Sequence, residues 1–516
     1  MAVEIERKAQ LIQETQQNAS SKPKQFVQKH LKEAESNKIA WISTALIILA
    51  FIFGIIVDDL SLPQFNAAKL EQGNQLKKSD LAKCYQTCSL SVVESVPQNL
   101  TILKHPLPST FEAWHSLIEN AKHSIDLAAY KSSLRGRHVL GSNTAEYSVE
   151  GDHIFDDLLN AGLNRSLNIR IVENAKSKDK GDNADGIVLF EQGAADRRTL
   201  NLAKLQDSGI MHSKFIITDE ANFYLGSANL DWRSLNQKLE MGVYVEECPC
   251  LARELKKVFD FYWDASLVKS KDEFEELLNE APSLNFNMQN PLRIKYKNAD
   301  TDVYIATSPK PTNSDQTWDL EAIVHTIETA ENYLYINVMD IFPIYLYSHN
   351  KEFWPVLDNA IRDAVLRGVH VKIVCAALHY PRLGLTFLKS LELINDITKK
   401  GSISIKIFKV PTPDTMFALL RRERRTHKKF MVSNSNWSGD YFEGTGVAIV
   451  VRQSKTGPQP FINEMRRVFE RDFESPYAYT LNDYYEACIN NSADLADFCE
   501  INKDVSFLET PTVSTL

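Results

Sequence analysis

The amino-acid sequence predicts an α/β protein of two similar halves, each a mixed, mostly parallel sheet flanked by helices, after one N-terminal transmembrane helix. Amphipathic helical stretches alternate with short buried strand-like stretches, which is typical of α/β layers. The same order of stretches recurs later in the chain, which indicates an internal repeat. The third observation is a charge-free apolar run near the start of the chain.

The apolar run covers residues 39–57 and predicts a membrane span. As a helix it would rise about 28 Å, close to the ~30 Å hydrocarbon core of a bilayer. Lysines precede the run, whereas Asp58 and Asp59 follow it, so the positive-inside rule places the N-terminus in the cytosol. We therefore expect a single-pass type II membrane protein whose catalytic part lies in the lumen of the endoplasmic reticulum, Golgi or endolysosome. Its first parts would be a cytosolic tail (1–38), a signal anchor (39–57) and a lumenal stalk (58–80).

Cysteine usage and glycosylation sequons agree with a lumenal chain. All 7 cysteines follow the apolar run, where disulfides can persist. The pairs Cys84/Cys88 and Cys248/Cys250 could form a four-thiolate zinc site, but an oxidising lumen favours disulfides between the pairs. An odd number of disulfide candidates remains, so one of these is left over: Cys375, Cys488 and Cys499. The glycosylation sequons begin at Asn99, Asn164, Asn490 and Asn436, the last of which has a competing role below.

Helix–strand segments recur between the two parts of the lumenal region. Residues 155–172 align with residues 357–374, and residues 114–130 match residues 320–338. Each half should therefore fold with the same order of elements. The expected parts are a first half (81–275), a polar connection (276–300), a second half (301–495) and a C-terminal tail (496–516).

Each half contains a histidine and a lysine two residues apart: His212 with Lys214, and His427 with Lys429. In a strand, such positions point to the same face, so a pocket would receive one imidazole and one ammonium from each half. Each pair is followed by a short element that contains an amide side chain: Asn229 and Asn436. Lysines and amides suit a phosphate anion, whereas histidines suit nucleophilic and acid–base work.

The repeated pattern resembles the paired His-x-Lys-x4-Asp motifs of the phospholipase D superfamily. Over roughly residues 80–490 the chain is similar to the lumenal single-pass branch of that family. Members of the branch were named phospholipases D, and the vertebrate ones are lysosomal 5′ exonucleases on single-stranded DNA and RNA. The resemblance implies two phospholipase D-type repeats. It also implies that His212 attacks phosphorus to form a phosphohistidine, while His427 protonates the leaving oxygen and then activates water.

The resemblance assigns roles to further residues. The phosphoryl oxygens would be held by Lys214, Lys429, Asn229 and Asn436. Asp219, the acidic member of the first motif, is expected to be structural rather than chemical. Glu240 matches the family carboxylate that orients the nucleophile, although taken alone it reads equally well as a surface carboxylate at a strand start. No metal and no other cofactor is implied.

The second motif is shorter than the first. Lys214 and Asn229 are 15 positions apart, whereas Lys429 and Asn436 are 7 apart. In the first half the additional residues predict a turn and a returning strand (219–227), which have no counterpart in the second. We keep three interpretations: a rerouted but active site, a catalytically impaired relative, and a wrongly spliced gene model. An insert recovered from the transcript between residues 432 and 434 would establish the third.

Charge and motifs leave three functions open. A net charge of −9 excludes a surface-wide basic binder of nucleic acid, but not a local basic site. A 5′ exonuclease on single-stranded DNA or RNA is favoured by an arginine run that precedes His427 and could grip substrate phosphates: Arg421, Arg422, Arg424 and Arg425. A phospholipase D that hydrolyses phosphatidylcholine to phosphatidate and choline is favoured by the membrane tether. A catalytically impaired lumenal glycoprotein is favoured only by the shortened motif, and a homodimer stays open as a partner.

Overall fold

The computed structural model describes residues 77–98, 100–101, 105–141, 147–175, 181–206, 209–310, 315–347, 352–376, 381–410 and 435–489. Within these ranges we find no helix that is both long enough and apolar enough to cross a bilayer. The predicted span (39–57) lies outside the described residues. So do these predicted site and modification residues: His427, Lys429, Arg421, Arg422, Arg424, Arg425, Asn99, Asn490 and Cys499.

The first half is organised around a seven-stranded sheet in the order β1-β9-β7-β6-β2-β4-β5. Its strands are β1 (Ser89–Ser95), β2 (Ser124–Ala129), β4 (Asn168–Asn174), β5 (Asp196–Leu200), β6 (Phe215–Thr218), β7 (Asn222–Gly226) and β9 (Glu240–Glu246). The pairings β2–β4 and β4–β5 are parallel, whereas every pairing from β1 through to β2 is antiparallel. The expected mostly parallel sheet is therefore wrong for this half. A tight turn at Asp219 and Glu220, both with positive φ, joins β6 directly to β7, and such a short connection permits only an antiparallel pair.

Helices cover both faces of this sheet. The helices α4 (Thr110–Asn120) and α6 (Val149–Leu163) share one apolar cluster with Ile216 of β6. The helix α10 (Pro249–Ala265) shares another cluster with Phe215 and Ile217. Successive β6 side chains thus enter opposite cores, as strand geometry requires. The remaining elements are α3 (Lys78–Thr87), β3 (Ser132–Ser133), α5 (Arg137–Leu140), α7 (Ala184–Glu191), α8 (Leu202–Gln206), β8 (Leu230–Asp231), α9 (Trp232–Asn236) and α11 (Lys271–Asn279).

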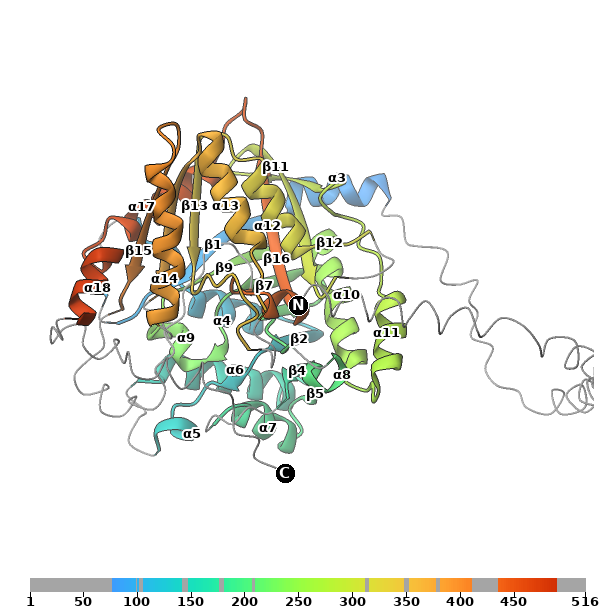
Figure 1. The fold of residues 1–516 in the computed structure, drawn as a ribbon. Helices are drawn as coiled ribbons and strands as arrows, with labels where there is room; N and C mark the ends of the chain where they lie inside the picture. Colours follow the sequence, from blue (N-terminus) through green and yellow to red (C-terminus); the bar gives the residue numbers. More distant parts are fainter. Residues whose placement is uncertain are drawn as a thin grey trace, which may run out of the picture. The chain divides into compact units, whose positions relative to one another are not determined.

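The described residues of the second half form two four-stranded sheets. One comprises β10 (Leu292–Tyr296), β11 (Ala299–Ser308), β12 (Thr317–Trp318) and β16 (Gly446–Gln453), with β16 antiparallel to β11. The other has the order β13 (Tyr333–Val338), β14 (His370–Ala376), β15 (Ser402–Phe408) and β17 (Ala478–Thr480), and its first three strands are parallel. Figure 1 shows β11 and β16, which are distant in sequence, side by side.

Helices again pack on these sheets. Figure 1 shows α12 (Asp319–Glu328), α13 (Val356–Arg367) and α14 (Pro381–Glu392) beside β13 and β15. The other helices are η2 (Leu393–Asp396), α16 (Asp440–Glu443), α17 (Pro460–Phe473) and α18 (Leu481–Ile489). Both α10 and α17 begin with a proline in the first turn, where its missing N–H costs no hydrogen bond.

The two halves share two groups of strands. The pair β11/β16 corresponds to β1/β9, and β13-β14-β15 corresponds to β2-β4-β5. In the first half, β7 and β6 join these two groups into one sheet. Among the described residues of the second half no strand fills that place, and the segment 411–434 lies outside them. That segment contains His427 and Lys429 of the shortened second motif.

One apolar core joins the halves. It contains Val92 and Val243 from the first half together with Ile305 and Ala448 from the second. Accordingly, residues 76–516 form one compact unit. The helix α11 runs across the expected boundary at residue 275, and β10 lies within the expected connection.

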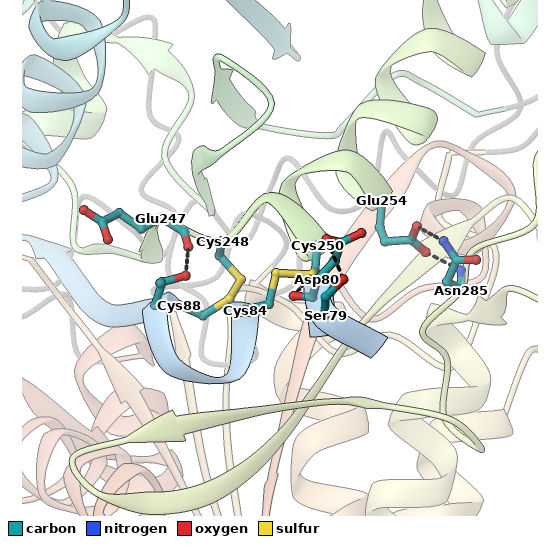
Figure 2. Close-up of a disulfide and its surroundings, with 10 residues drawn as sticks. Ser79, Asp80, Cys84, Cys88, Glu247, Cys248, Cys250, Glu254 and Asn285 are labelled. Atoms are coloured by element: carbon teal, nitrogen blue, oxygen red, sulfur yellow. Dashed lines mark hydrogen bonds between the residues drawn. A yellow bond between two sulfur atoms is a disulfide. The ribbon is translucent and has the colours of Figure 1, made fainter. Parts of the chain in front are cut away.

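Two disulfides tie α3 to the start of α10 (Figure 2). They join Cys84 to Cys250 and Cys88 to Cys248. The predicted disulfides between the pairs are thus confirmed, and these thiols are not zinc ligands. Cys375 is a free thiol buried within β14, so this disulfide candidate forms no disulfide. The disulfides suggest a chain of the secretory pathway.

Candidate active site

The second half positions the segment that carries His212. This residue lies in an extended stretch just before β6, rather than within a strand as predicted. Met211 forms an isolated parallel bridge with Thr445, and the His212 N–H donates to Thr445 Oγ1 at 3.0 Å. The Ser213 hydroxyl also donates to Thr445 Oγ1 at 3.0 Å. Because Thr445 immediately precedes β16, the position of His212 depends on both halves.

Two tyrosines flank the His212 imidazole, one from each half. The ring centroid of His212 lies 5.1 Å from that of Tyr130 and 5.0 Å from that of Tyr441. Lys214 Nζ lies 5.4 Å from the Tyr130 centroid and donates to the His212 carbonyl. The imidazole and the ammonium therefore lie against the same tyrosine, in agreement with their spacing of two residues.

Asn229 and Asn436 occupy equivalent positions in the two halves. Each precedes a residue in a parallel bridge: Leu230 pairs with Ser132, and Trp437 pairs with Ile341. Both asparagines are buried. A glycan at Asn436 does not fit this environment, because a bulky sugar needs an exposed amide. Asn164, by contrast, is exposed at the C-terminal end of α6.

The surroundings of the two amides differ. The Asn436 side chain hydrogen-bonds to the Tyr441 hydroxyl, so it is linked through Tyr441 to the imidazole of His212. Its Nδ2 also contacts Met339 Sδ at 3.9 Å. The Asn229 Oδ1 is buried and has no hydrogen-bond partner among the described residues.

Glu240 is buried at the start of β9. Its two oxygens accept hydrogen bonds from Ser227 Oγ at 2.6 Å and Ser234 Oγ at 3.3 Å. Burial raises the pKa of Glu240 to about 7, although the charges of Lys238 and Lys214 act to lower it. The surface-carboxylate interpretation is therefore wrong, and Lys214 links Glu240 electrostatically to the His212 segment.

Asp219 lies in the turn between β6 and β7. Its carboxylate accepts three backbone hydrogen bonds, from the N–H groups of Lys122, His123 and Ser124, at 2.8 to 3.0 Å. These bonds fix the turn against the start of β2. Asp219 thus holds the hairpin in place and makes none of the contacts around His212 described above.

Sequence comparisons identify the family. A family model described as "PLD3/4, PLD-like domain" matches residues 105–413. The "5'-3' exonuclease PLD3" of Xenopus laevis is 34% identical over 484 residues, which cover 90% of this chain and 96% of the relative. The chain belongs to the PLD3/4 family of the phospholipase D superfamily. The predicted resemblance is confirmed.

Other relatives carry two kinds of name. The "5'-3' exonuclease PLD3" of Homo sapiens is 32% identical over 466 residues, covering 87% of this chain and 91% of the relative. The "Probable phospholipase D F09G2.8" of Caenorhabditis elegans is 34% identical over 456 residues, covering 85% and 76%. The solved phosphatidylserine synthase of Haemophilus influenzae matches 78% of this chain and 93% of its own, with a TM-score of 0.51 and 11% identity. That likeness shows a shared fold alone.

In this member of the PLD3/4 family, the second half carries a buried carboxylate on a different element. Glu240 pairs with Ser95, and at the equivalent register Gly446 pairs with Ser308. A Cβ at Gly446 would lie 2.7 Å from Asp319 Oδ2, so the aspartate fills the space that a side chain would need. Asp319, at the start of α12, accepts hydrogen bonds from Ser435 at 2.9 Å and from Ser308.

A second difference between the halves lies two residues after the strands β2 and β13. Lys131 and Asp340 occupy equivalent positions, because each precedes the bridge residue named above. Lys131 Nζ lies 3.3 Å from Asp182 and 3.8 Å from Asp231, so its charge is compensated. Burial raises the pKa of Asp340 to about 7, and its charge in turn contributes to the raised pKa of Tyr441.

Sequence reasoning missed several residues of this region: Tyr130, Thr445, Tyr441, Asp319 and Asp340. For Tyr130 and Asp340 the only sequence signal was their position one and two residues after the strands β2 and β13. Thr445 and Tyr441 carried no such signal, because their contacts with His212 arise from the packing of one half on the other.

Proposed function

We propose that this protein is a lumenal phosphodiesterase that removes nucleotides from the 5′ end of single-stranded DNA or RNA through a phosphohistidine on His212. The observation that carries the proposal is the His212 imidazole, held between Tyr130 and Tyr441 with the Lys214 ammonium beside it. The names of the PLD3 relatives support the nucleic-acid substrate. The disulfides support the lumenal location.

The proposed reaction has two displacements at phosphorus. A ring nitrogen of His212 attacks the phosphorus, a P–N bond forms, and the bond to the leaving oxygen breaks as His427 donates a proton to that oxygen. His427 then removes a proton from water, which adds to phosphorus and breaks the P–N bond. The backbone N–H of His212 donates to Thr445 Oγ1 and so fixes the position of the nucleophile before substrate arrives. This reduces the entropic cost of attack.

Cationic and amide side chains would stabilise the transition state. Lys214 would place its charge near the phosphoryl oxygens, and Asn229 and Asn436 would donate from opposite halves. Lys429 would add the second ammonium. Losing one such donor typically costs roughly 100- to 1,000-fold in rate.

An aromatic path supports a nucleic-acid substrate over a lipid. The Tyr441 ring lies 6.0 Å from the ring of Tyr347, whose side chain is 54% exposed. Rings therefore continue from His212 outward to solvent. Unpaired bases stack on exposed aromatic rings, and each such contact is worth about 1–3 kcal/mol.

The direct test offers the purified full chain 5′-hydroxyl single-stranded DNA at acidic pH. We expect nucleotide release by the wild-type protein and a loss of roughly 1,000-fold or more for His212→Ala. His370→Ala, an exposed histidine of β14, is the matched control and should retain activity. Full activity in His212→Ala would refute the assignment.

A phospholipase D is the second candidate, favoured by the name of the Caenorhabditis elegans relative and by the predicted membrane tether. It would release choline from phosphatidylcholine under the same conditions, again dependent on His212. The shortened second motif favours a third candidate, a catalytically impaired glycoprotein. Neither product would then appear, although the protein is folded.

A further inference from the structure

Two histidines and an aspartate meet between α4 and α6, and none of them takes part in the His212 contacts. His115 lies on α4, whereas His153 and Asp157 lie one turn apart on α6. One nitrogen or oxygen of each side chain lies within 4.8 Å of the others. His115 Nδ1 is 2.7 Å from Asp157 Oδ2, and His153 Nε2 is 3.9 Å from Asp157 Oδ1. The carboxylate thus lies between the two imidazoles.

The scaffold under this cluster is rigid. The two helices pack through apolar side chains that are almost fully buried, among them Trp114 of α4 and Leu158 of α6. The Phe111 ring lies 5.9 Å from the His115 ring and 5.6 Å from the His153 ring, measured between centroids. Phe111 therefore contacts both imidazoles at once. The helices fix the backbone on both sides of the cluster.

The cluster is open to an incoming ion. The His115 and His153 side chains are 39% and 54% exposed, whereas that of Asp157 is 9% exposed. Exposed imidazoles rotate at little cost, so the longer separation can close to the roughly 3.4 Å that a tetrahedral ion with ~2.1 Å bonds requires. The buried carboxylate supplies the fixed ligand, and the histidines close on it.

We propose that His115, His153 and Asp157 bind a zinc ion that links α4 to α6. Imidazole nitrogen and carboxylate oxygen are zinc ligands, and sites with three protein ligands leave a fourth position for water. Calcium and magnesium instead prefer shells made almost entirely of oxygen, which two imidazoles do not offer. Zinc would replace the His115–Asp157 hydrogen bond. The site is independent of the proposed phosphodiesterase chemistry.

The test is a zinc titration of the full chain, stripped with a chelator and held at pH 7.5, with competition against a zinc indicator. We expect one zinc ion per chain and an affinity loss of roughly 100-fold or more in His115→Ala and in His153→Gln. His123→Ala, an exposed histidine outside the cluster, is the matched control. His212→Ala shows whether zinc instead occupies the active site. Both controls should bind zinc as the wild type does.

A thermal-unfolding series gives a second readout. Zinc should raise the unfolding midpoint of the wild type, and of both controls, but not that of the cluster variants. Midpoints measured without zinc establish whether each variant is folded. If His115→Ala does not fold, His153→Gln still tests the proposal, because His153 is the more exposed of the two histidines. The proposal is overturned if the wild type takes up no zinc, or if the cluster variants bind it as tightly as the wild type.

Discussion

Replacing Asp340 by asparagine should stabilise the protein at neutral pH and leave its stability in acid almost unchanged. Asp340 is buried after β13, and burial alone raises its pKa to about 7 from an ordinary value of 3.8. The equivalent lysine of the first half, Lys131, is instead paired with carboxylates. Asp340 therefore carries a desolvation cost whenever it is ionised.

The magnitude and sign follow from the shift. A pKa raised by about three units corresponds to about 4 kcal/mol, at ~1.4 kcal/mol per unit. The folded state binds the Asp340 proton more tightly than the unfolded state does. The contribution of Asp340 to the free energy of unfolding of the wild type is therefore highest below about pH 4 and falls as the pH rises to about 7. Asparagine is neutral throughout, so Asp340→Asn removes this loss.

The assay is urea unfolding of the full chain at pH 4.5 and pH 8, followed by tryptophan fluorescence. Relative to wild type, Asp340→Asn should gain up to about 4 kcal/mol at pH 8 but only about 1 kcal/mol at pH 4.5. Asp315→Asn, at an exposed position, serves as the matched control and should change neither value. A variant equally or less stable at pH 8 would refute the reasoning.

Three further predictions concern the carboxylates and disulfides. Glu240→Gln should lower kcat by roughly 100-fold or more while KM stays near the wild-type value, because we propose that Glu240 acts through Lys214 on the His212 segment rather than on substrate. An unchanged kcat would remove Glu240 from the site. Cys88→Ser should lower the free energy of unfolding in denaturant by only about 2 kcal/mol. The remaining Cys84–Cys250 disulfide already closes a loop with a sequence separation of 166, and such a loop alone is worth about 5 kcal/mol. A loss of about 5 kcal/mol would contradict the nested arrangement. Gly446→Ala should destabilise the chain by about 1–3 kcal/mol, because its Cβ would lie 2.5 Å from Ser435 Oγ and 2.7 Å from Asp319 Oδ2. Gly457→Ala, whose new Cβ would lie 3.7 Å from Ser454 Cβ, is the control.

Local patterns predicted the elements well. The segments 155–172 and 357–374 both fold as the expected helix and strand, because apolar periodicity is a local property. Whether neighbouring strands pair parallel or antiparallel, by contrast, is not a local property of the sequence. The sequence predicted the hairpin of β6 and β7, but the antiparallel pairings of β9 with β1 and β7 depend on chain segments far apart. Likewise, the disulfides between the cysteine pairs could be predicted from the chemistry of an oxidising compartment. The free thiol of Cys375 could not, because its burial in β14 is known only from the fold.

The candidate site divides in the same way. His212, Lys214 and the asparagines were found because motif spacing repeats within the chain. Thr445 and Tyr441 were not, since their roles arise only when the second half packs on the first. Asp319 was hidden for a different reason: the second half takes its carboxylate from the start of a helix, and Gly446 leaves the room for it.

The central claim is that His212 becomes covalently attached to phosphorus. The measurement is a rapid alkaline quench of the full chain with single-stranded DNA labelled at the scissile phosphate, followed by peptide mapping. Because His427 serves both displacements, its removal would slow formation and hydrolysis alike, so the intermediate is captured on the wild-type chain during its first turnovers. We expect a base-stable, acid-labile phosphoramidate on the peptide that contains His212, absent in His212→Ala. Label on another residue, or continued turnover without any covalent label, would contradict it.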